Sequence, residues 1–165
     1  VESIPKQGVR IPVRTKEQLT EVYRVREALE VMVAYLLCLN ATAEQKEELY
    51  LMAEECDTIN VEDPDSVEYF AEKHRELHLA MAQTTGNPEL TENLKRLGLR
   101  IILHRSAKTT WYKKVDDWAF WHRNLMDEIF SGDPVRAQEA MHRHIQHGLR
   151  NDLESYETGG SDDGA

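Results

Sequence analysis

The sequence predicts an all-α protein, folded as an antiparallel bundle of about six helices. Helix start signals recur at regular intervals along the 165 residues. No stretch shows convincing period-2 alternation, apart from a weak "VRIPV" near the start. The expected links between helices are short, and short links make successive helices antiparallel neighbours.

Each signal has a physical basis. The first two helices open with the capping-box pattern, Thr followed three residues later by Gln, at Thr15 and Thr42. Asp-Pro pairs at 63–64 and 133–134 place an N-cap before a proline at the first helical position. "TGNPEL" at 85–90 ends one helix and starts the next. The expected helices are 16–40, 43–60, 64–85, 88–106, 112–131 and 134–157.

Composition narrows the function classes. Charged residues make up 30% of the chain and the formal net charge is −10, which argues against this chain gripping DNA or an anionic membrane by itself. No apolar run reaches membrane-spanning length.

Cys38 and Cys56 form no CxxC motif, so we expect two small core residues in a reducing cytoplasm. The tail at 158–165 is expected to be disordered.

The histidines form the most informative pattern. Helical periodicity places four of the seven on core-facing stripes of three different helices. They are His74, His78, His122 and His144. A single buried histidine more often finds its partners within the protein than binds a metal, since imidazole both donates and accepts hydrogen bonds. Four buried histidines without a common partner would leave many ring nitrogens in need of hydrogen bonds. One metal ion could instead bind a nitrogen of each of the four rings. Spacing alone does not show that the three helices meet.

Four segments then occur in a specific order: "LTEVYRVREALE" (19–30), "HRELHLAMAQTTGNPEL" (74–90), "WHRNLMDEIFSGDP" (121–134) and "AMHRHI" (140–145). Together they resemble the FCD domain, the effector-binding domain of FadR-type regulators in the GntR family. The resemblance runs from about Lys16 to Tyr156 and implies a domain over 15–157. It implies a helical bundle that encloses a metal ion and a small-molecule pocket.

The resemblance also implies a ligand set. The family's usual ligands are an Asp and a His one turn apart, then one His on each of two later helices. The three His positions match His78, His122 and His144. His74 occupies the Asp position, a departure that leaves open whether His74 is a ligand. A set of imidazoles suits Zn, Ni, Co or Cu better than Mg or Ca, and we expect Zn or Ni.

The head of the chain implies a DNA-binding partner domain. "VESIPKQGVRIP" (1–12) is similar to the last wing strand of the winged-helix domain that precedes FCD domains. We therefore expect residues 1–14 to be a wing and linker remnant, and DNA contact to occur only through a missing N-terminal domain. The resemblance further implies a cytoplasmic homodimer without membrane contact.

An arginine lies on the apolar stripe of the first helix. Arg26 is followed one turn later by Glu30, which predicts an ion pair within the helix. The functional interpretation, compatible with the first, is a guanidinium that grips the carboxylate of a small organic acid. FCD domains use an arginine at the matching position for acid effectors. His104, on the fourth expected helix, is a weaker candidate for the same pocket.

Two other classes of function stay open at this point. One is a histidine-rich helical metalloenzyme, either a hydrolase or an oxygen-binding protein. A hydrolase usually needs a general base beside the metal. Di-iron proteins use a Glu-x-x-His motif on each of two helices, and the sequence has this motif only once, at 139–142, so it does not provide the bridging pair. The other is a metal-stabilised interaction bundle without an effector.

Overall fold

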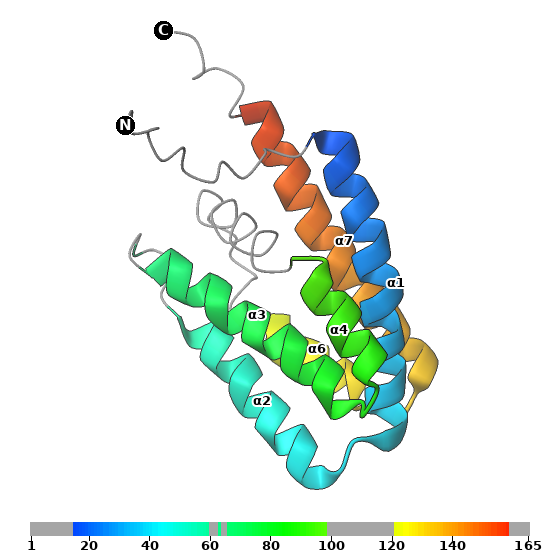
Figure 1. Cartoon of the computed structure of the whole chain (residues 1–165). Helices are drawn as coiled ribbons and strands as arrows, with labels where there is room; N and C mark the ends of the chain where they lie inside the picture. Colours follow the sequence, from blue (N-terminus) through cyan, green and yellow to red (C-terminus); the bar gives the residue numbers. More distant parts are fainter. Residues whose placement is uncertain (1–14, 60–62, 64–65, 99–120, 159–165) are drawn as a thin grey trace, which may run out of the picture.

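All regular elements in the described part of the chain are helices. The computed structural model describes residues 15–59, 63, 66–98 and 121–158. The helices, shown in Figure 1, are α1 (Lys16–Asn40), α2 (Ala43–Thr58), α3 (Val67–Thr84), α4 (Pro88–Arg96), α6 (Trp121–Ile129) and α7 (Pro134–Thr158). The predicted all-α fold is confirmed.

The predicted caps explain where several helices begin. Thr15 Oγ1 accepts from the backbone N–H of Gln18 at 3.2 Å, and Gln18 Oε1 accepts from the backbone N–H of Thr15 at 3.0 Å. The same reciprocal pair opens α2 at Thr42. Asp133 Oδ1 accepts two backbone N–H groups from the first turn of α7, at 2.9 and 3.3 Å. These bonds satisfy donors that a helix start otherwise leaves unpaired.

Among the described residues, two helix boundaries differ from the expected ones by three residues or more. The prediction of one helix over 88–106 is wrong, because α4 ends at Arg96 with Gly98 following at φ +70°. Glycine adopts this left-handed conformation without a steric penalty and so terminates helices. α3 begins at Val67, three residues later than the predicted 64. The first part of the helix expected at 112–131 lies outside the described residues.

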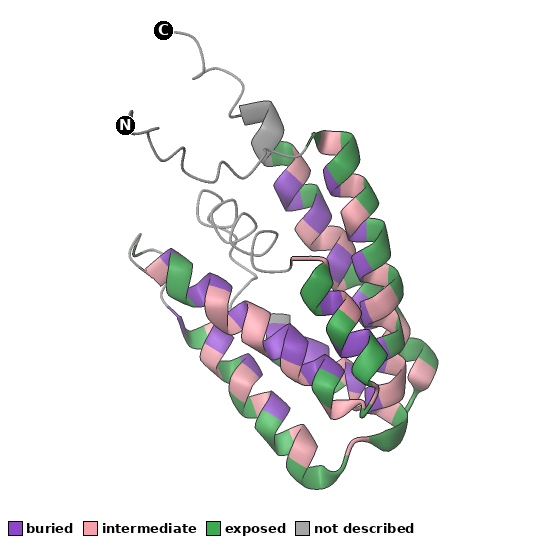
Figure 2. Cartoon of the chain, viewed as in Figure 1, coloured by how far each residue is buried: buried purple, intermediate pink, exposed green. Residues whose placement is uncertain are grey.

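α1 occupies a central place in the bundle. It runs antiparallel to α7 and also packs against α3, α4 and α6. α2 packs against α3 and α6. Buried residues line the facing sides of these helices (Figure 2), and Leu37, Leu77 and Ile129 are at most 1% exposed. No helix in the described ranges is both long and apolar enough to span a membrane.

Candidate metal centre

The four predicted histidines meet at one point in the core. His74 and His78 come from α3, His122 from α6 and His144 from α7. Each contributes one ring nitrogen to a group whose members lie within 4.8 Å of one another. We call this group, His74, His78, His122 and His144, the histidine cluster. His144 is half-buried, and the other three are at most 8% exposed.

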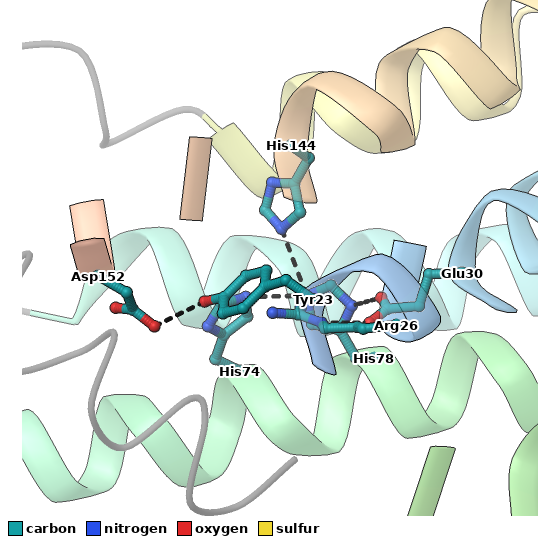
Figure 3. A network of polar contacts seen from close by, with 7 residues as sticks. All are labelled: Tyr23, Arg26, Glu30, His74, His78, His144 and Asp152. Atoms are coloured by element: carbon teal, nitrogen blue, oxygen red, sulfur yellow. Dashed lines mark hydrogen bonds and ion pairs between the residues drawn. The ribbon is translucent and has the colours of Figure 1, made fainter. Parts of the chain in front are cut away.

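A buried ion pair on α1 orients His78. Arg26 Nε donates to Glu30 Oε1 at 2.5 Å, and the other carboxylate oxygen of Glu30 accepts from His78 Nδ1. Figure 3 shows these residues converging from α1 and α3. Because a carboxylate only accepts hydrogen bonds, His78 carries its proton on Nδ1. The Nε2 lone pair of His78 therefore faces the cluster.

A second carboxylate orients His122. Asp57 Oδ1 accepts from His122 Nδ1 at 2.7 Å and from the backbone N–H of His122 at 3.3 Å. Asp57 Oδ2 accepts from the backbone N–H of Arg123 at 2.9 Å. Asp57 thus caps α6 and fixes the imidazole at the same time. Carboxylates commonly hold metal-binding histidines in this way.

Two ring nitrogens of the cluster are under-satisfied. His122 Nε2 and His74 Nδ1 are buried without a hydrogen-bond partner among the described residues. His78 Nε2 lies 2.9 Å from His74 Nε2 and 3.3 Å from His144 Nε2. A single lone pair cannot accept from two neighbours equally, whereas one metal ion would bind a nitrogen of each ring. Metal–imidazole bonds of about 2.0–2.1 Å place neighbouring ligand nitrogens roughly 3 Å apart, and these spacings fit.

Burial keeps the imidazoles in the form that binds metals. Burial, together with the other histidines of the cluster, holds the pKa of His74 and of His144 well below the usual range. Burial also lowers the pKa of His78, although Glu30 opposes the change. These three rings are therefore neutral near pH 7, as metal coordination requires.

The carboxylate and guanidinium beside the cluster stay charged. Burial opposes the ionisation of Glu30, but Arg26 and His78 together favour it and lower the pKa of Glu30 to about 2. Burial likewise opposes the charge on Arg26, but Glu30, Tyr23 and Asp152 raise the pKa of Arg26. Arg26 Nη2 reaches to 3.4 Å from His78 Nε2. A permanent positive charge thus lies at the edge of the cluster.

Tyr23 and Asp152 form the next polar contact on the α7 side. Tyr23 Oη donates to Asp152 Oδ2 at 2.8 Å, and both residues are at most 1% exposed. The guanidinium carbon of Arg26 lies 5.5 Å from the centre of the Tyr23 ring, within cation–π range. The ring of Phe70 packs on His74 and His122, with ring centroids 5.5 and 6.3 Å apart. The polar groups are therefore enclosed by packed side chains.

Most predicted site residues come together. The four histidines and Arg26 are adjacent, and the expected Arg26–Glu30 pair is present but buried. His104 lies outside the described residues. Sequence reasoning missed Asp57, although it ends the apolar stripe of α2 that contains Ala53 and Cys56. A carboxylate on such a stripe needs a buried partner, the same signal that identified Arg26.

Comparison with known protein families agrees with this architecture. The FCD domain family matches residues 21–147, which is most of the chain. The chain belongs to the FCD domain family. The FCD domain is the C-terminal effector-binding domain of FadR-type regulators in the GntR family. No curated protein matches this FCD domain at a significant level.

Proposed function

We propose that this FCD domain binds one divalent transition metal through the histidine cluster and a small organic acid beside it. Acid binding then controls a winged-helix DNA-binding domain of the same regulator. The observation that carries the proposal is the convergence of four imidazoles, two of them fixed by carboxylates on Nδ1. An ordinary buried histidine needs one partner and not three neighbouring imidazoles.

The donor set favours Zn or Ni. Imidazole nitrogen suits late transition metals, whereas Mg and Ca prefer oxygen ligands. His74 in the family's Asp position makes the protein ligands neutral, so the ion keeps its full formal charge beside an anion. When bound, the metal supplies a positive centre that holds a carboxylate.

Arg26 is the second half of the acid site. Its Nε is engaged by Glu30, which fixes the guanidinium in place, while Nη2 approaches His78. An acid that reaches the cluster therefore meets a fixed planar donor group next to the ion. Arginine binds carboxylates through paired parallel hydrogen bonds that lysine cannot reproduce.

The rival enzyme interpretation has less support. A hydrolase needs a base that can take a proton beside the metal. In the part of the chain that the structure describes, two carboxylates contact the cluster, Glu30 and Asp57, and imidazole, guanidinium or backbone donors already occupy both. We therefore propose a sensor and not a catalyst. The proposal places the protein in the cytoplasm, with its DNA, as a homodimer.

Metal content tests the first half of the proposal. His122→Ala should retain less Zn or Ni than the wild type after equal loading and desalting. His142→Ala is the matched control, because His142 also lies in the histidine-rich region, with its side chain 53% exposed and bonded to Glu27. Equal metal content in His122→Ala and His142→Ala would show that His122 is not a ligand.

An acid screen tests the second half. Small organic acids should raise the melting temperature of the metal-loaded protein, and a chelator should abolish the shift, as mass action requires. Calorimetry with the best acid should show weaker binding to Arg26→Lys, although the charge is kept. His74→Asp should retain the metal but bind the acid less tightly. Stabilisation by the metal without any acid response would favour the interaction bundle.

A further inference from the structure

The metal proposed for the histidine cluster leaves one buried nitrogen without a role. Among the described residues, two buried side-chain atoms lack a hydrogen-bond partner, His122 Nε2 and His74 Nδ1. Asp57 holds Nδ1 of His122, so Nε2 is the nitrogen of that ring that would bind the ion. His74 Nδ1 has no such explanation. His74 is 8% exposed, and a buried polar atom without a partner is destabilising.

The contacts of His78 decide which nitrogen of His74 serves the ion. Glu30 accepts from Nδ1 of His78, so Nε2 is the nitrogen with which His78 can bind a metal. His74 Nε2 lies 2.9 Å from this atom, and Figure 3 shows the contact. A proton on His74 Nε2 would therefore point at the lone pair that the ion needs. Metal binding by both rings requires His74 to present an unprotonated Nε2.

His74 then carries its proton on Nδ1. Burial, together with the neighbouring histidines, holds the pKa of His74 well below the usual range, so the ring is neutral near pH 7. A neutral imidazole has one N–H group and one lone pair, and here the lone pair belongs to Nε2. Nδ1 is consequently a buried N–H donor without an acceptor among the described residues. The Asp that usually occupies this position in FCD domains would offer no N–H group.

This donor lies near the guanidinium of Arg26. Arg26 Nη2 and His74 Nε2 lie 3.4 and 2.9 Å from the same atom, Nε2 of His78. In the imidazole ring of His74, a single carbon separates Nε2 from Nδ1. Both donors are therefore within reach of one small molecule.

We propose that His74 Nδ1–H donates a hydrogen bond to an oxygen atom of the acid other than the carboxylate that Arg26 binds. The inference rests on the metal and acid sites proposed above, and it narrows the class of effector. An acid with a hydroxyl or keto oxygen close to its carboxylate satisfies the donor, whereas a simple alkanoate leaves it buried and unpaired. Sites with a buried donor discriminate strongly against the ligand that lacks the acceptor. His74 is thus a specificity-determining residue of this chain.

Pairs of acids that differ by one hydroxyl group test this selection. The pairs are 2-hydroxybutyrate and butyrate, malate and succinate, and glycolate and acetate, titrated by calorimetry into the zinc-loaded protein. The hydroxy acid of at least one pair should bind about tenfold more tightly than its partner. In His74→Asp at matched zinc occupancy, this preference should fall to about twofold or less, because aspartate can hold the ion but has no N–H group. The two acids of a pair carry equal charge, so their ratio is independent of the general loss of acid affinity expected for His74→Asp.

His142→Ala is the matched control. The side chain of His142 is 53% exposed and lies outside the histidine cluster, so this variant should keep the wild-type preference. Equal binding within all three pairs, a preference that survives in His74→Asp, or one that His142→Ala also loses would overturn the role of His74 and leave the acid site standing. A zinc-loaded protein that binds none of the six acids would overturn the acid site and the role of His74 together.

The position of the proton can be tested without any acid. Long-range proton–nitrogen NMR spectra of the zinc-loaded wild-type protein distinguish a histidine proton on Nδ1 from one on Nε2. We expect the proton of His74 on Nδ1, as for His78 and His122, whose Nδ1 atoms donate to Glu30 and Asp57. A proton on Nε2 of His74 would overturn the proposal, even where the protein binds acids. This measurement uses the unaltered chain, so it does not depend on the folding of a variant.

Discussion

Replacing Asp57 by asparagine tests how the protein holds its candidate metal ligand. The side chain of Asp57 is 6% exposed and accepts three hydrogen bonds from the start of α6. Asparagine has nearly the same shape but offers one acceptor oxygen in place of two. If its amide NH2 faces Arg123, two donors meet there. If it faces His122, Nδ1–H loses its acceptor and the ring can place its proton on Nε2 instead.

The expected magnitudes follow from these contacts. Loss of one helix-capping bond from a buried carboxylate should destabilise the metal-free protein by about 1–2 kcal/mol. Loss of the fixed tautomer should weaken metal binding by about 10–100-fold, the usual effect of removing a partner of a metal-binding histidine. The two effects are separable, because urea unfolding of the metal-free protein reports the first and chelator competition on folded protein the second.

Glu54→Gln provides the control for charge. Glu54 lies on the same helix and contacts Arg123 at 3.5 Å, but both side chains are more than half exposed. The substitution removes the same negative charge without touching His122. We expect its metal affinity to stay within a few-fold of the wild type, since exposed pairs contribute little. Equal metal affinities for Asp57→Asn and Glu54→Gln would refute the positioning role of Asp57.

Three further outcomes are expected. Glu30→Gln should lower the unfolding free energy of the metal-free protein by about 3–5 kcal/mol, because it leaves the buried Arg26 without its charged partner. Urea unfolding measures this loss, and a loss below about 1 kcal/mol would contradict the expectation. Tyr23→Phe should cost about 1–3 kcal/mol in the same assay, since Asp152 loses a donor in the core, and an unchanged midpoint would argue against that bond. Burial raises the pKa of the Cys56 thiol to about 12. A thiol reagent should therefore label Cys56 only after the protein is unfolded, as detected by mass spectrometry. Rapid labelling of the native protein would contradict the burial of Cys56.

Local chemistry made most of the fold predictable. The caps at Thr15, Thr42 and Asp133 join residues two or three positions apart, so short sequence patterns are enough to predict these hydrogen bonds. The signal that ends α4 is also local, since it is the single residue Gly98. However, Gly98 lies inside an apolar pattern that continues beyond it. Periodicity extended the expected helix through Gly98, while the conformational freedom of glycine ended it.

The site was predictable in part, for a different reason. Helical periodicity assigned each histidine to a core-facing stripe, but it carries no information about which stripes meet. The family resemblance supplied that step, and the structure brings the rings together. The sequence did not predict the role of Asp57, because its partner, His122, lies 65 positions further along the chain. No local pattern links two such residues; only the unexplained carboxylate on an apolar stripe marks the position.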